Sequence, residues 1–174
     1  MTQFDLRQAL RNLDIEIKPF GYGERDLKEL EGDGYLRGYS HARWLCVNPE
    51  ERWPVLVTFH EMAHILRGDT MAHKKFGVDL DAFKAGKVPM WDKNLNKFID
   101  YKEQNHDIIE TECHATAILA CQLTDTDFDL RDELTHLTQY TLGRDIPKHV
   151  MDAAYKTAKK IWAAGKVDAR SLAA

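Results

Sequence analysis

Apolar residues recur at helical spacing in several stretches of the chain. The clearest stretch is "VLVTFHEMAHILRGD", in which every third or fourth residue is apolar: Phe59, Met62, Ala63 and Leu66. This spacing predicts an amphipathic helix. Asn48 and Pro49 offer a start signal, whereas Pro54 delays the regular helix to about Trp53. Gly68 is expected to end it.

The same reasoning predicts the other elements. "TQFDLRQALRNL" has the pattern of a short amphipathic helix with Thr2 as its N-cap. Further helices are expected over about 108–123, 133–142 and 148–164, and Gly165 is expected to end the last. "ARWLCVN" is typical of a strand that stops at Asn48. We therefore expect an α+β fold, mainly helical, with a small sheet preceding the "HEMAH" helix.

The segment between the "HEMAH" helix and the helix expected over 108–123 differs from both in its pattern of polar and apolar residues. Residues 69–107 are polar and irregular, with "HKKFG", "KAGKVP" and "DKNLNK", and they predict a long surface insertion. A chain of 174 residues fits one domain with a sizeable core, so we expect residues 1–174 to form a single domain.

Composition and charge indicate which partners and which compartment we expect, but they do not indicate an activity. The net charge of −4 gives no field that would draw the chain to nucleic acid, and we expect no nucleic-acid partner. No stretch approaches the ~20 apolar residues of a membrane span, and the N-terminus lacks the apolar core of a signal peptide. The three cysteines are scattered, which is typical of free thiols in a reducing compartment. We expect a cytoplasmic protein without membrane contact.

"HEMAH" is the candidate chemical site. On a helix, His60 and His64 are four residues apart, so both imidazoles project from one face and can reach one metal ion. Glu61 lies beside the first histidine, where it can reach a water on that metal without being a ligand. This is the place of the general base in a zinc hydrolase. The alternative is a surface helix on which these residues meet by chance.

Two histidines need a third ligand to form a catalytic metal site. A third histidine in the metzincin pattern is absent, because Thr70 occupies its position. Asp69 lies where the helix should be ending. On the second helix, Glu112 is in line with small and apolar residues, whereas Glu110 lies two positions earlier, close to the opposite side. We therefore predict Glu112 as the third ligand, with Glu110 in an outer shell or in solvent.

Other side chains are weaker candidates. His114 is expected on the surface or in packing, away from Glu112, although a role as a ligand or as a donor to the transition state stays open. Tyr35, Tyr39 and His41 precede the motif helix, and one of them is a candidate donor to an oxyanion.

Together, "HEMAH" and "ETECHATAILA" resemble the ImmA/IrrE family of metallopeptidase domains and the related zincin domain of ArdC-type antirestriction proteins. The family pairs the H-E-x-x-H helix with a second helix that carries E-x-x-A, which Glu112 to Ala115 fits. The resemblance covers about residues 34–129. It implies a zincin-like fold, one zinc ion and hydrolysis of regulatory proteins such as repressors. The chain departs from the family in its 69–107 segment, and it lacks room for the DNA-binding modules of ArdC-type proteins.

The sequence leads to a hypothesis and a rival. The hypothesis is a zinc metallopeptidase that cleaves a protein or peptide substrate, with Zn²⁺ on His60, His64 and Glu112 and with Glu61 as the general base. The substrate would lie extended beside the motif helix, pairing with the strand near Trp44. The rival is a zincin-fold binding protein, an antirestriction or regulatory factor that acts without proteolysis through the 69–107 segment.

Overall fold

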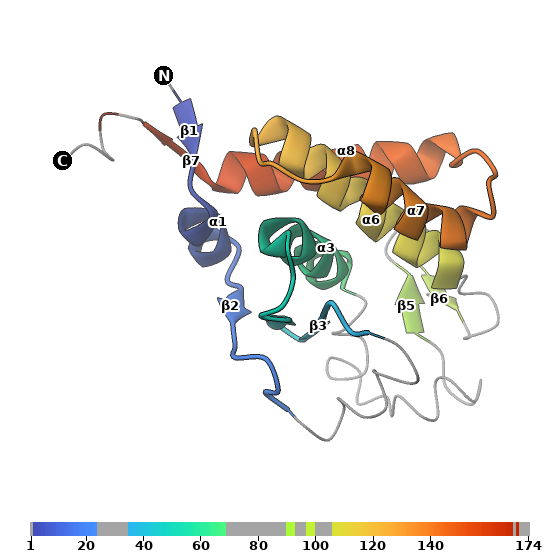
Figure 1. Cartoon of the computed structure of the whole chain (residues 1–174), viewed down its shortest axis with the longest axis horizontal. Helices are drawn as coiled ribbons and strands as arrows, with labels where there is room; N and C mark the ends of the chain where they lie inside the picture. Colours follow the sequence, from blue (N-terminus) through green and yellow to red (C-terminus); the bar gives the residue numbers. More distant parts are fainter. Residues whose placement is uncertain are drawn as a thin grey trace.

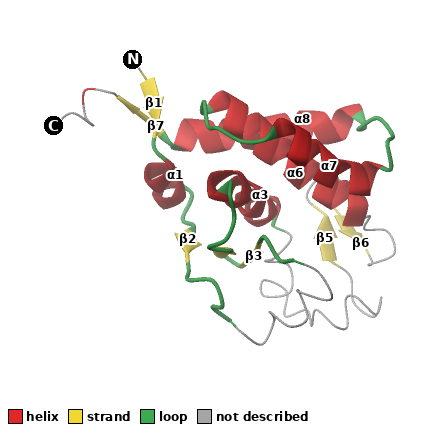
Figure 2. Ribbon diagram, viewed as in Figure 1, coloured by secondary structure: helices red, strands yellow, loops and turns green. Residues whose placement is uncertain are grey.

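The computed structural model describes residues 2–23, 35–68, 90–92, 97–99, 106–168 and 170 (Figure 1). Its helices in these ranges are α1 (Leu6–Asn12), α3 (Pro54–Arg67), α6 (His106–Leu123), α7 (Leu130–Thr141) and α8 (Lys148–Ala164). The strands are β1 (Thr2–Phe4), β2 (Glu16–Ile17), β3 (Gly38–His41), β4 (Trp44–Val47), β5 (Met90–Asp92), β6 (Lys97–Ile99) and β7 (Lys166–Asp168). Figure 2 shows that helices predominate, so the α+β class is confirmed.

The motif helix α3 has the ends that its sequence predicts. It begins at Pro54 with Trp53 as N-cap, so the later of the two start positions is confirmed. Proline is tolerated there because its missing N–H would have no partner in the first turn. The helix ends at Gly68, whose φ of 83° is left-handed and whose N–H bonds to the carbonyls of His64 and Ile65.

Helix α3 lies between a small sheet and the other helices. On one side it packs against β3 and β4, which belong to a three-stranded sheet of order β2-β4-β3. On the other side it packs against α6, which also packs against α7 and α8 (Figure 1). Phe59, Met62 and Ile65 of α3 are buried in the core that this arrangement encloses. His60 and His64, on another face of α3, lie close to Glu110 of α6.

The N-terminal prediction was partly wrong. Residues Thr2 to Phe4 form a strand that pairs with β7, near the other end of the chain. The helix begins only at Leu6 and is capped by Asp5, whose Oδ1 accepts hydrogen bonds from the backbone N–H groups of Arg7 and Gln8 at 2.8 and 3.2 Å. Thr2 is therefore not the N-cap. Local helical periodicity could not reveal a strand partner more than 160 residues away.

The other helices agree with their prediction except at one boundary. Helix α7 begins at Leu130, about one turn before the expected Glu133, because Asp129 caps it by accepting a hydrogen bond from the N–H of Asp132 at 3.1 Å. Of the predicted insertion, the structure describes only β5 and β6, which pair antiparallel. The rest of residues 69–107, apart from the first turn of α6, lies outside the described residues. Within the described parts, no helix has both the length and the apolar character of a membrane span.

Candidate metal centre

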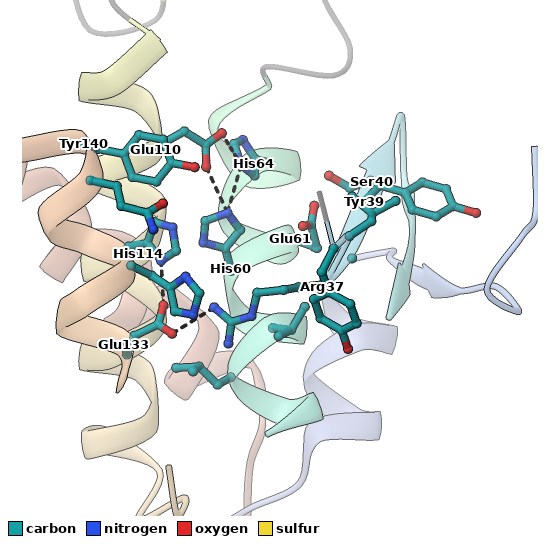
Figure 3. Close-up of a pocket in the computed structure, with 17 residues that line it drawn as sticks. Arg37, Tyr39, Ser40, His60, Glu61, His64, Glu110, His114, Glu133 and Tyr140 are labelled. Carbon is teal, nitrogen blue, oxygen red and sulfur yellow. Dashed lines mark hydrogen bonds and ion pairs between the residues drawn. The ribbon is translucent and has the colours of Figure 1, made fainter. Parts of the chain in front are cut away.

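The two histidines of the motif converge as their spacing predicts. Nε2 of His60 and Nε2 of His64 lie 3.2 Å apart on the face of α3 that looks towards α6 (Figure 3). Both side chains are largely buried, with 13% and 15% of their surfaces exposed. A helix brings residues i and i+4 onto one face, one above the other, which explains the convergence.

The carboxylate that joins these histidines belongs to Glu110. Its Oε2 lies 3.3 Å from Nε2 of His60, and its Oε1 lies 3.3 Å from Nε2 of His64. Glu112 turns instead to Arg67, in the last turn of α3, and forms an ion pair with its Nη1. The structure therefore brings Glu110, and not the predicted Glu112, to the two histidines.

The placement of Glu110, instead of Glu112, at the histidines has a physical cause. The choice of Glu112 assumed that α6 has one buried face, marked by small and apolar residues. In the structure α6 is packed by α3, α7 and α8, and its middle is buried on every side, from Thr111 through Ala117. The positions of its apolar residues therefore do not reveal which side meets α3. Glu110 and His114, four residues apart, share the side that faces the histidines.

His114 belongs to the same cluster, contrary to the expectation of a surface or packing role away from the site. Its ring lies 4.4 Å, centroid to centroid, from that of His60. Donor atoms of His60, Glu110 and His114 lie within 4.8 Å of one another, so this group could hold a metal ion. Two sets of three candidate ligands therefore share His60 and Glu110. His64 completes one set, and His114 completes the other.

The protonation states of the cluster suit metal binding. Burial, together with the nearby charge of His114, lowers the pKa of His60 to about 4, so its imidazole is neutral near pH 7. Burial alone would raise the pKa of Glu110. Hydrogen bonds to His60 and His64 outweigh it and hold that pKa well below its usual range. A neutral imidazole and an ionised carboxylate are the forms that ligate metals.

Glu61 occupies the place expected of a general base. It is 7% exposed and lies between the histidine cluster and Ser40 of β3 (Figure 3). Burial raises the pKa of Glu61 above its usual value, although the charge of His64 and the nearby hydroxyl of Ser40 oppose the shift. A carboxylate with a raised pKa is a stronger base than an exposed glutamate.

A second buried group was missed by the sequence analysis. Glu133 of α7 is 1% exposed, and both of its oxygens are engaged. Oε1 lies 2.5 Å from Nδ1 of His114, and Oε2 accepts a hydrogen bond from Nη1 of Arg37 at 3.0 Å. The sequence held one signal for Glu133, because it lies four residues before the buried Leu137 and therefore shares its face.

These groups surround a cavity of about 760 Å³. His60, Glu61, His64, Glu110 and His114 all line it, together with residues of β3 and α7. The volume is in the range of pockets that bind small molecules or peptide side chains.

The expected oxyanion donors are placed differently. Tyr35 and Tyr39 line the cavity, but the hydroxyl of Tyr39 donates to the carbonyl of Tyr22 at 2.7 Å and accepts from the N–H of Gly21 at 3.0 Å. His41 packs against Trp44, with 5.7 Å between ring centroids. Tyr140 of α7, which the sequence did not single out, lines the cavity with its ring stacked on His114 at 5.4 Å.

Comparison with known proteins adds nothing to this geometry, because no protein-family model, no curated protein and no solved structure matches the chain.

Proposed function

We propose that this protein is a zinc-dependent metallopeptidase in which His60, His64 and Glu110 hold the ion. One observation carries the proposal. The two Nε2 atoms and the Glu110 carboxylate approach one another to 3.2–3.3 Å, with the buried Glu61 beside them. The resemblance to ImmA/IrrE domains is part of the proposal, and Glu110 takes the place that the resemblance gave to Glu112.

The donor set fits zinc. Ligands that hold zinc tetrahedrally at about 2.0–2.2 Å lie about 3.3–3.6 Å from one another, close to the spacings between these three residues. Two imidazoles and one carboxylate are typical of a catalytic zinc site, in which three protein ligands leave one position for water or substrate. A structural zinc site is usually closed and rich in cysteine, whereas the cysteines of α6, Cys113 and Cys121, are buried as free thiols.

Each residue of the cluster has a role in hydrolysis of a peptide bond. A zinc ion supplies Lewis acidity, which polarises the substrate carbonyl and makes water a nucleophile near neutral pH. A carboxylate oxygen of Glu61 removes the proton from that water as it attacks the carbonyl carbon. The same carboxyl group then delivers the proton to the nitrogen of the leaving amine as the C–N bond breaks.

His114 is the candidate for stabilising the transition state. Glu133 engages its Nδ1, which leaves Nε2 for a group in the cavity. With a proton on Nε2, the imidazole donates a hydrogen bond to the oxygen that becomes negative during attack.

The substrate would lie in the cavity between α3 and α7, beside β3. Gly38, Tyr39 and Ser40 of β3 form one wall of that cavity. The earlier expectation that a substrate pairs with the strand near Trp44 is wrong, because β4 is the central strand of the sheet and pairs with β2 and β3.

The proposal is tested by mass spectrometry of a proteome-derived peptide library after incubation with the zinc-loaded protein. We expect cleavage by the wild type, and loss of cleavage with retained zinc in Glu61→Gln. The matched control is Asp132→Asn, because Asp132 is an acid on α7 with 56% of its side chain exposed. Cleavage that persists in Glu61→Gln overturns the mechanism, and partner binding without any cleavage supports the rival binding function.

A further inference from the structure

The cavity is crossed by a chain of charged side chains that the ligand set does not use. Arg37, which precedes β3, extends beneath His60 to reach α7 (Figure 3). Its Nη1 donates to Oε2 of Glu133 at 3.0 Å, and its Nε donates to Oε1 of Glu51 at 3.2 Å. Arg37 and Glu133 are 96 residues apart in the sequence, so the fold alone brings them together.

Removing such charges from water is costly. Glu133 is 1% exposed, and the side chain of Arg37 is 19% exposed. Buried ion pairs contribute little net stability, because the desolvation penalty offsets most of the attraction. Two apolar side chains of similar volume at positions 37 and 133 would stabilise this contact at least as well. The energetic cost therefore points to a function for the charges besides packing.

We propose that Arg37 and Glu133 are positioning residues that fix the tautomer of His114 and present its Nε2 to the metal centre. An ionised carboxylate is an acceptor only, so the nitrogen that lies 2.5 Å from Oε1 of Glu133 must carry the hydrogen. That nitrogen is Nδ1. In the neutral imidazole, Nε2 therefore bears a lone pair, and in the cation it bears a proton that can be donated.

Arg37 keeps Glu133 in the acceptor state. Burial alone would raise the pKa of Glu133, but the hydrogen bonds and charges of His114 and Arg37 lower it to about 2. Arg37 has donors only, so it also holds Oε2 on its own side and leaves Oε1 for His114. The inference rests on the proposed function for its catalytic meaning, whereas the tautomer itself does not depend on peptidase activity.

The two residues make a sharp test because an amide has only one acceptor. In Glu133→Gln, Arg37 donates to the oxygen of the new amide, and the NH₂ group of that amide then faces Nδ1 of His114. Nδ1 must become an acceptor, which moves the proton of the neutral ring to Nε2. In Arg37→Met/Glu133→Gln the amide oxygen is free to turn to His114, so the Nδ1–H form returns. The double variant leaves neither Arg37 nor Glu133 as an unpaired buried charge, but it also removes the Arg37 partner of Glu51.

The tautomer is measured by long-range ¹H–¹⁵N correlation spectra of the full chain labelled with ¹⁵N-histidine, with and without zinc. His114→Gln identifies the His114 signals. We expect Nδ1–H in the wild type, Nε2–H in Glu133→Gln, and Nδ1–H in the double variant and in the control Asp132→Asn. A wild type with Nε2–H overturns the inference even if Glu133→Gln does not fold, and so does a Glu133→Gln spectrum that keeps Nδ1–H.

Kinetics separate a positioning role from a structural one. We expect kcat of Glu133→Gln to fall by about 100-fold or more, with KM and zinc content nearly unchanged, because an amide NH₂ group that faces Nδ1 excludes the doubly protonated ring that donates from Nε2. In the double variant Nδ1–H again meets an acceptor, so kcat should recover in part. If the tautomer of His114 switches in Glu133→Gln but kcat is unaltered, Glu133 has no positioning role in catalysis. If the wild type cleaves no peptide, the proposed function fails, while the spectra still decide whether Arg37 and Glu133 set the tautomer.

Discussion

Gly38 is a position where the strand wall of the cavity comes close to α3. A Cβ atom at this residue would lie 2.8 Å from the carbonyl oxygen of Cys46 and 2.8 Å from Cγ1 of Val57, and 3.5 Å from Cγ of Glu61. The first contact is with backbone of the paired strand and cannot be relieved by a side-chain rotation. We predict that Gly38→Ala forces β3 away from α3 and Glu61.

The cost follows from the overlaps. Ordinary contact at a Cβ begins at 3.4 Å, so each of the two short contacts must open by several tenths of an ångström. Overpacking of this kind typically costs about 1–3 kcal/mol. For a protein of this size, each kcal/mol lowers Tm by about 2–4 °C. The expected fall in Tm is therefore about 2–12 °C.

A double-mutant cycle with Val57→Ala isolates the contact. Urea denaturation gives the free energy of unfolding of the wild type, both single variants and the double variant. Because Val57→Ala removes the Cγ1 atom, the double variant should be more stable than the sum of the single effects predicts, by about 0.5–2 kcal/mol. Effects that add within about 0.5 kcal/mol, or a Gly38→Ala protein as stable as the wild type, refute the close approach.

Three further predictions follow from buried groups outside the ligand set. Glu112→Ala removes an ion-pair partner of Arg67 and should lower the free energy of unfolding by about 2–3 kcal/mol, measured by urea denaturation, while zinc content stays at the wild-type level. Burial raises the pKa of the Cys121 thiol to about 12. Iodoacetamide at pH 8 should therefore leave this thiol unmodified in the native protein and alkylate it after denaturation. Alkylation of Cys121 in the folded chain would contradict its buried position. The pKa of Glu133 is lowered to about 2, below the ~4.3 of an unfolded glutamate, so its stabilising effect is complete above about pH 4.3 and disappears towards pH 2. The difference in unfolding free energy between wild type and Glu133→Gln, measured in chelator, should shrink over that interval, and a constant difference would contradict it.

The features that could be predicted from the sequence are those with local causes. The period of its apolar residues places α3, which begins at Pro54 and ends at Gly68 through the backbone preferences of these two residues. The convergence of His60 and His64 follows from helical spacing alone. Glu61 then lies beside them because it is the next residue on the same helix.

The features that were missed depend on contacts between distant segments. Periodicity cannot choose between Glu110 and Glu112, because α6 is covered by three helices and has no single apolar face. Arg37 and Glu133 read as ordinary surface charges until the fold buries them against each other. The pairing of β1 with β7 joins the two ends of the chain and likewise leaves no local signal.

The central claim is that His60, His64 and Glu110 bind one metal ion, and elemental analysis of purified protein tests it most directly. We predict about one zinc per chain in the wild type and in Glu112→Ala, and a large loss of zinc in His60→Ala, His64→Ala and Glu110→Ala. His114→Ala should retain zinc. If this variant loses zinc, the ligands are instead His60, Glu110 and His114. A wild type that contains no zinc and takes up none when it is added, or a Glu110→Ala protein that keeps the ion, contradicts the account.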